Sequence, residues 1–97
     1  MILNSKQRKI LEKAAHDMQP VVIVGGAGIS DGLINMVDTS LASHELIKIK
    51  FNDYKDEKQD LTNQICDATN ATLVRIIGNI AILYREAEKE DDRKYNI

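Results

Sequence analysis

The chain has 97 residues, enough for one domain with a two-layer core and too few for a second domain. Its net charge of −2 excludes a protein that coats nucleic acid indiscriminately, and its single cysteine, Cys66, excludes an intramolecular disulfide and a cysteine-based four-ligand zinc site. The N-terminus has no apolar run, so we expect no signal peptide and no membrane span, and a cytoplasmic location.

A first helix is predicted to begin at Asn4 or Ser5, where Gln7 can complete a capping box, and to end before Pro20. Apolar residues at helical spacing predict its buried stripe, namely Ile10, Leu11, Ala14, Ala15 and Met18. Three lysines of this helix share an arc of about 60° beside that stripe, namely Lys6, Lys9 and Lys13. We interpret this arc either as a solvated helix face or as an edge that contacts phosphate.

A short buried strand at residues 20–24 leads into a glycine-rich segment, Gly25-Gly26-Ala27-Gly28. Ser30 is predicted to cap the next helix, which runs to about residue 43. A strand, a G-x-x-G loop and a helix N-terminus together form a place where phosphate can bind to backbone N–H groups.

The second half of the chain predicts a strand at 46–51, a helix at about 56–69 and a hairpin of strands at 72–77 and 80–85. In the first of these strands Lys48 and Lys50 alternate with core residues and face the other side of the sheet together with Leu46. Helix 56–69 is predicted to turn Leu61, Ile65 and Ala68 inward, with Cys66 beside them as a small core residue, and to end at Asn70 in the left-handed conformation. Gly78-Asn79 suits the two-residue turn of the hairpin, and Arg75 and Arg85 interrupt its apolar strands.

The predicted fold is a two-layer α/β domain over residues 1–85, with the order α-β-α-β-α-β-β and a mixed four-stranded sheet. One face of this sheet is packed and the other is at least partly open. Residues 86–97 have no apolar periodicity. They are predicted to be a charged C-terminal tail, either a helical extension or a frayed end.

Several kinds of active or cofactor site are not supported by the sequence. The dinucleotide fingerprint fails because Asp31 stands where its last glycine should be, and the P-loop lysine is absent before Ser30. His16 and His44 lie near helix ends and form no metal-ligand or catalytic pattern. We therefore predict a protein that is not an enzyme and holds no metal or cofactor.

Nucleic-acid binding fits the residues better. A G-x-x-G loop between a strand and a helix is how KH-type modules clamp a nucleic-acid backbone. Here the loop coincides with a lysine-bearing helix edge and with a strand that carries Lys48 and Lys50 on its open side. The alternative is a protein-interaction module without direct RNA contact.

The sequence resembles the CRM domain family (chloroplast RNA splicing and ribosome maturation), in its single-domain bacterial YhbY-type form. The resemblance runs over about residues 3–85 and rests on an ordered set of short motifs. These are Lys6-Gln7-Arg8 with Leu11, Ala15-His16, Pro20-Val21-Val22, Gly25 to Gly28, His44-Glu45-Leu46-Ile47-Lys48-Ile49-Lys50, Ile77-Gly78 and Leu83-Tyr84-Arg85.

The resemblance implies a fold similar to the C-terminal domain of translation initiation factor three, with an added N-terminal helix. It also implies binding to RNA of large ribosomal subunit precursors during ribosome assembly, with no membrane or DNA partner expected. In this context the alternative is a protein-interaction module that docks on a ribosomal protein or an assembly factor without direct RNA contact. Many family members carry a basic residue inside the glycine loop, whereas this loop reads Gly-Gly-Ala-Gly, so backbone amides must supply more of the contact. The predicted RNA-binding residues are Gly25, Gly26, Ala27, Gly28, Lys6, Lys9, Lys13, Lys48, Lys50, Arg75 and Arg85.

Overall fold

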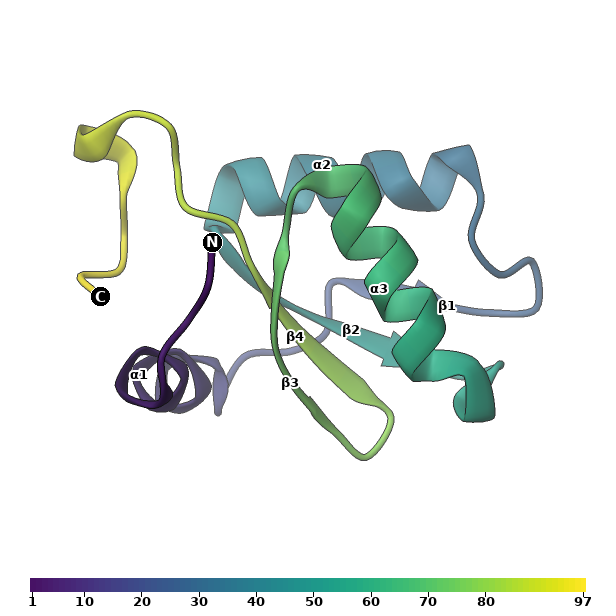
Figure 1. The fold of residues 1–97 in the computed structure, drawn as a ribbon. Helices are drawn as coiled ribbons and strands as arrows, with labels where there is room; N and C mark the ends of the chain where they lie inside the picture. Colours follow the sequence, from purple (N-terminus) through teal and green to yellow (C-terminus); the bar gives the residue numbers. More distant parts are fainter.

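Three helices and four strands follow one another in the predicted order in the computed structural model, which describes all 97 residues (Figure 1). They are α1 (Ser5–Ala15), β1 (Val22–Val24), α2 (Asp31–His44), β2 (Leu46–Phe51), α3 (Lys58–Thr69), β3 (Thr72–Ile77) and β4 (Ile80–Tyr84). Short 3-10 turns lie at η1 (Lys55–Glu57) and η2 (Glu90–Asp92). None of the helices has the length and hydropathy needed to cross a membrane.

The four strands form one mixed sheet in the order β1-β2-β4-β3. β1 pairs with β2 in parallel, and β4 pairs with β2 and β3 antiparallel, which confirms the predicted sheet. Helices α2 and α3 lie side by side on one face, and their apolar stripes pack against the sheet (Figure 1). This main core contains twelve buried residues, namely Val22, Val24, Leu33, Val37, Leu41, Ile47, Ile49, Phe51, Ile65, Cys66, Ala81 and Leu83.

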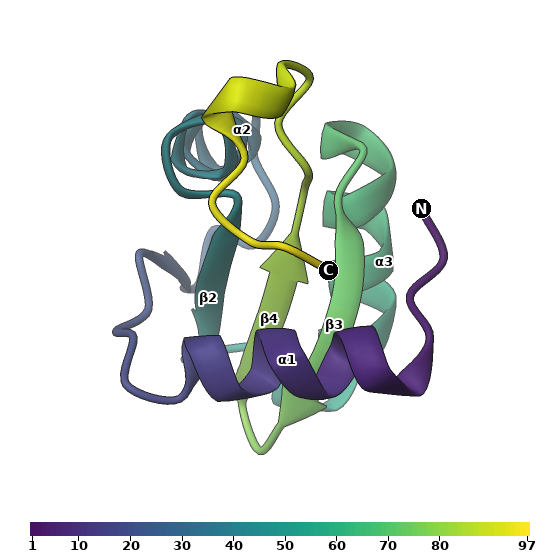
Figure 2. The ribbon, with the colours of Figure 1, turned by 90° about the vertical axis from the view of Figure 1, so that its left-hand side faces the viewer.

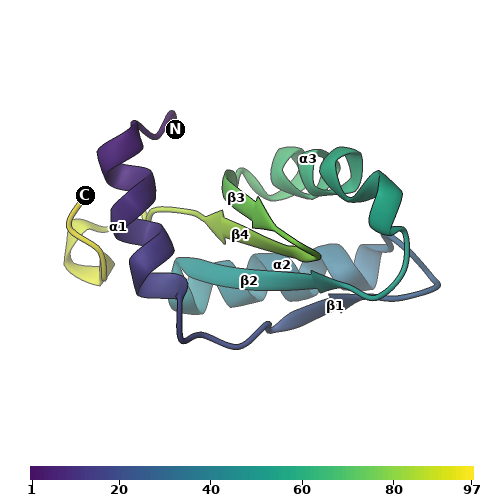
Figure 3. The ribbon, with the colours of Figure 1, turned by 90° about the horizontal axis from the view of Figure 1, so that it is seen from below.

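Helix α1 lies across the strands on the opposite face and makes a partial third layer (Figure 2). Beneath it is a second cluster of seven buried residues, Leu3, Leu11, Ala15, Leu46, Val74, Ile82 and Tyr84. Leu46 faces this side as predicted and is fully buried there. The predicted α/β fold is confirmed, and α1, which lies outside the two main layers, covers one end of the otherwise open face and leaves the other end uncovered (Figure 3).

The buried stripes of two helices differ from the prediction. On α1 only Leu11 and Ala15 are buried, and Ile10 and Ala14 are exposed, because a helix that rests on a sheet contacts it along a narrow line. On α3 the buried residues are Thr62, Ile65, Cys66 and Thr69, and Ala68 is exposed. The Thr69 hydroxyl donates to the carbonyl oxygen of Ile65 at 2.8 Å, which lets a polar residue lie in the stripe.

Local signals for caps and turns are confirmed. Asn4 and Gln7 form the reciprocal capping box at the start of α1. Asn70 ends α3 with φ 58°, in the left-handed region, and Gly78 has φ 58° in the hairpin turn.

Residues 86–97 are neither a helical extension nor a frayed end. They are largely extended, with one 3-10 turn at η2, and they pass over the face that carries α1 (Figure 2). The buried carboxylate of Glu45 accepts hydrogen bonds from the backbone N–H groups of Ala87, at 2.6 Å, and Lys94. The Tyr95 ring packs edge-on against Tyr84, with ring centroids 6.3 Å apart. A sequence window of the tail alone could not predict these contacts, because the anchoring carboxylate lies about 45 residues away.

Candidate nucleic-acid interface

The glycine segment forms a tight turn at the carboxyl end of β1. The N–H of Gly28 donates to the carbonyl oxygen of Gly25 at 2.9 Å, which closes the turn. Gly28 has φ +66°, in the left-handed region, which glycine adopts without the strain that a Cβ atom causes, so glycine is favoured there. The turn leads directly to Ser30, whose side chain accepts from the N–H of Leu33 at 3.1 Å and caps α2.

Tyr54 holds this turn in place, a role that the sequence did not indicate. Its hydroxyl donates to the carbonyl oxygen of Gly26 at 2.8 Å. Its ring would lie 3.4 Å from a Cβ atom added at Gly28, so the ring packs directly over this residue. Tyr54 lies in the polar turn after β2. The sequence feature that could have indicated its role is an aromatic residue in an otherwise polar segment. Tyr54 therefore fixes the shape of the loop.

The tip of the turn faces solvent. Gly26 and Ala27 are exposed, and a Cβ atom added at Gly26 would meet nothing within 4 Å. The backbone N–H groups of these two residues donate to no acceptor within the protein. Two such amides beside a capped helix N-terminus can receive an anionic oxygen.

The charges near the turn are mostly acidic. Residues 25–31 and 52–58 include four acidic side chains, Asp31, Asp53, Asp56 and Glu57, against the basic Lys55 and Lys58. Any cationic attraction for a polyanion must therefore come from another part of the surface.

The three lysines of α1 supply such a surface. Lys6, Lys9 and Lys13 are exposed, and helical geometry places them on the side turned away from the buried Leu11 and Ala15. None of their amines forms an ion pair within the protein. Helix α1 and the glycine turn lie toward opposite ends of a molecule whose longest dimension is 37 Å (Figure 1).

The two lysines of β2 have different environments. The Lys48 amine donates to the carbonyl oxygens of His16, at 3.2 Å, and Met18, at 3.0 Å, and so binds the chain that leaves α1. Lys50 is exposed on the uncovered part of the sheet, where its amine has no partner. Only Lys50 of this pair has its charge available to a ligand.

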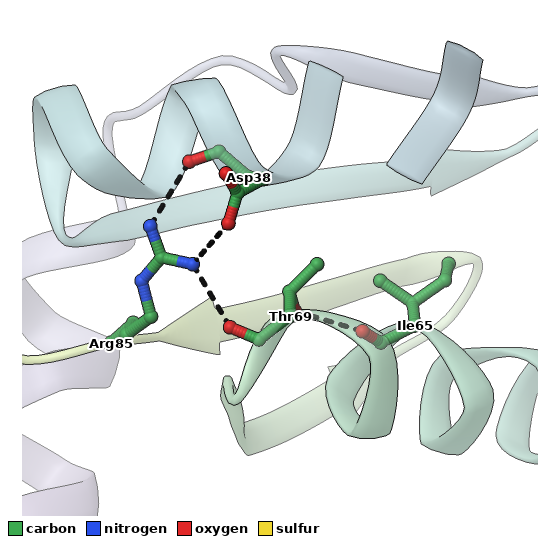
Figure 4. A network of polar contacts seen from close by, with 4 residues as sticks. All are labelled: Asp38, Ile65, Thr69 and Arg85. Carbon is green, nitrogen blue, oxygen red and sulfur yellow. Dashed lines mark hydrogen bonds and ion pairs between the residues drawn. The ribbon is translucent and has the colours of Figure 1, made fainter. Parts of the chain in front are cut away.

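Both arginines of the hairpin also have partners within the protein. Arg75 pairs with Glu12 of α1 at 3.2 Å. The guanidinium group of Arg85 contacts the Asp38 carboxylate at 2.6 Å, the Asp38 carbonyl oxygen at 3.1 Å and the Thr69 carbonyl oxygen at 2.9 Å (Figure 4). Arg85 thus joins α2 to the last residue of α3, and its charge is largely neutralised.

A further basic residue, Arg8, has a structural role that sequence patterns did not indicate. Its guanidinium group donates to the carbonyl oxygen of Leu73 at 2.9 Å and to that of Val74. These carbonyls lie at an irregularity in the pairing of β3 with β4, between Leu73 and Arg75. Arg8 therefore supports the extra residue of a β-bulge.

The run His44-Glu45-Leu46-Ile47-Lys48 is mainly a structural element. Glu45 anchors the C-terminal tail, and Lys48 binds the end of α1. Leu46 and Ile47 lie in the two different core clusters on opposite faces of the sheet. The motif therefore joins the layers of the fold to one another.

Comparison with known proteins identifies relatives along nearly the whole chain. A protein of Haemophilus influenzae named RNA-binding protein is 39% identical over 88 residues, which are 90% of this chain and 89% of the relative. A probable RNA-binding protein of Pseudomonas aeruginosa is 32% identical over 98 residues, covering 100% of this chain and 94% of the relative.

A solved structure and a family profile agree with these relatives. The solution structure of a Staphylococcus aureus protein, described as a candidate RNA-binding protein, has a TM-score of 0.79 and 30% identity, and covers 98% of this chain and 100% of its own. The profile of the CRS1/YhbY (CRM) domain matches residues 3–85. This chain therefore belongs to the CRS1/YhbY (CRM) domain family.

Proposed function

We propose that this protein binds RNA of large ribosomal subunit precursors in the cytoplasm and takes part in ribosome assembly without enzymatic activity. The Gly25–Gly28 turn would hold a backbone phosphate through the N–H groups of Gly26 and Ala27. Lys6, Lys9 and Lys13 would neutralise further phosphates.

The observation that carries the proposal is the exposed turn with two unpartnered amides and no side chain in the way. The names of the Haemophilus and Pseudomonas relatives, which both refer to RNA binding, support it. The acidic surroundings of the turn make a side-chain contact there unfavourable. The turn would thus contribute shape and hydrogen bonds, while α1 contributes charge.

The separation of the two surfaces constrains the RNA. Because α1 and the turn lie toward opposite ends of the molecule, a ligand that contacts both must be extended. A folded RNA segment can do this, whereas a mononucleotide cannot. We therefore expect measurable affinity for structured RNA fragments and none for free nucleotides.

The proposal is tested by replacing both Gly26 and Ala27 with Asp. Two carboxylates at the tip would repel phosphate, so we expect at least a tenfold loss of affinity for large-subunit ribosomal RNA fragments in fluorescence anisotropy. The matched control replaces both residues with Asn, which has the same size and no charge, and should lose no more than about threefold. Both variants should melt close to the parent protein, because the position of a Cβ atom at Gly26 is open.

If the Asp variant binds RNA like the parent, the turn has no role in the contact. The assembly role is tested separately by sedimentation of cell extracts. Co-sedimentation with large-subunit precursors should be lost in the Asp variant. Association that survives digestion of the RNA would instead favour docking on a protein.

A further inference from the structure

The uncovered half of the sheet carries an apolar row that RNA binding does not explain. The register aligns Ile23 of β1 with Lys50 of β2, Lys50 with Ile80 of β4, and Ile80 with Ile77 of β3. Four neighbouring strands span about 14 Å, so the row crosses the whole sheet. Figure 3 shows this end of the face free of α1 and of the C-terminal tail.

Two of the three isoleucines of the row are exposed, and Ile80 is half-buried. Ile23 is 54% exposed and Ile77 is 52% exposed, and Val21, which precedes β1, is 40% exposed. Single apolar residues on a surface need no explanation, but three of the protein's eight exposed large hydrophobic residues lie on this one half-face. Such a concentration marks an interaction surface.

The chemistry of the row favours a protein partner. Bases of single-stranded RNA bind on aromatic rings, and this row contains only aliphatic side chains around one lysine. Lys50 has no partner within the protein, and no strand places an acidic residue on this half-face. A partner surface complementary to this row is therefore apolar and carries one carboxylate near its centre, opposite Lys50.

Helix α1 shows what kind of element this face accepts. It lies across the strands, packs Leu11 and Ala15 on the sheet and pairs its Glu12 with Arg75 (Figure 2). The row lies about three residues further along β2 than the centre of the α1 contact, a distance of about 10 Å. Packed neighbouring helices are separated by about 8–10 Å, so a second helix fits beside α1.

We propose that the row Ile23, Lys50, Ile80 and Ile77 docks an amphipathic helix of a partner protein, which places a carboxylate on Lys50. The helix lies beside α1 and completes the third layer of the domain. This interaction is independent of RNA binding at the glycine turn. In this interaction Lys50 pairs with a carboxylate of the partner protein and not with a phosphate of RNA.

The test uses a photoreactive residue, p-benzoylphenylalanine, introduced in the full chain in the native host at Ile77, at Ile23 and, as a control, at Met36. Met36 lies on α2 and is 55% exposed, similar to the two row positions. Both row positions should crosslink to the same protein in an adduct that resists ribonuclease, and Met36 should not. Mass spectrometry should map the adduct to a helical segment that carries Asp or Glu beside apolar residues.

The charge contact is tested by adding Lys50→Glu to the Ile77 variant. Crosslinking should fall at least fivefold, and exchanging the mapped carboxylate of the partner for lysine should restore it. An adduct that ribonuclease removes, an adduct with a second copy of this chain, or no adduct above the Met36 control would each overturn the proposal. RNA affinity of an Ile23→Thr, Ile77→Thr variant should stay within twofold of the parent, which separates this surface from the proposed RNA site.

Discussion

Single side chains decide which charges of this protein are available to a ligand. Lys48 and Arg85 are basic residues of the types that commonly bind RNA phosphates. Both, however, donate hydrogen bonds to carbonyl oxygens within the fold. Lys9 and Lys50, by contrast, are exposed, and their amines have no partner within the protein. The difference lies in the partner of each group, which only long-range contacts define.

The thiol of the single residue Cys66 predicts how the free energy of unfolding depends on pH. Burial, with a smaller effect of Asp67, raises the pKa of its thiol from 9.0 to about 11, so the thiol is neutral and unreactive at neutral pH. Above pH 9 the unfolded chain loses this proton while the folded chain retains it. The free energy of unfolding should therefore fall as pH rises from 9 to 11, by about 1 kcal/mol at pH 10.

Urea denaturation at pH 8 and pH 10 measures this loss. Cys66→Ala should remove most of it, because the pKa of the other shifted group, Tyr84, is raised from 10.0 to about 12 and that group contributes mainly above pH 10. Rapid reaction of the native thiol with a thiol reagent at pH 8 would contradict the assignment of Cys66 to the core.

Among the elements, the C-terminal tail depends most on one distant residue. Glu45 is buried, has φ 61° and accepts two backbone hydrogen bonds from the tail. Hydrogen bonds to a charged group contribute about 1.5–3 kcal/mol each. Glu45→Ala, which removes both bonds, should therefore lower the free energy of unfolding by about 3–6 kcal/mol. Glu45→Gln should lower it less, because its amide keeps one acceptor oxygen.

Limited trypsin digestion reports on the tail directly. The Glu45 variants should be cut faster at Lys89 and Lys94 than the parent protein, whereas Glu88→Ala, at an exposed acidic residue in the tail, should be cut at the parent rate. Unchanged cleavage in Glu45→Ala would show that other contacts, such as Tyr95 on Tyr84, hold the tail by themselves.

The whole molecule has a net charge of −2, so its electrostatic attraction for RNA must come mainly from the lysines of α1. If each of the three lysines of α1 neutralises about one phosphate, the plot of log K against log salt should have a slope of roughly −2 to −3. Replacing Lys6, Lys9 and Lys13 with Gln should make that slope shallower by about 2 to 3, because each lysine accounts for about one released counterion.

Fluorescence anisotropy titrations over a range of salt concentrations give the slopes. Lys48→Met is the control, since it keeps the apolar stem and loses a donor that is used inside the fold. It should lower the free energy of unfolding by about 1 kcal/mol and leave the slope unchanged. An affinity that does not depend on salt would exclude the electrostatic contribution of α1.

The sequence by itself determined the order of the elements, the capping box at Asn4, the turns at Asn70 and Gly78, and the family. These features depend on residues a few positions apart, whose conformational preferences act locally. The tertiary structure alone decided that threonines fill the α3 stripe, that Glu45 anchors the tail and that the glycine turn lies far from the α1 lysines. It also decided which basic side chains have partners and which apolar row stays uncovered. These properties depend on contacts between distant segments, because burial and hydrogen-bond partners are set only when the layers pack.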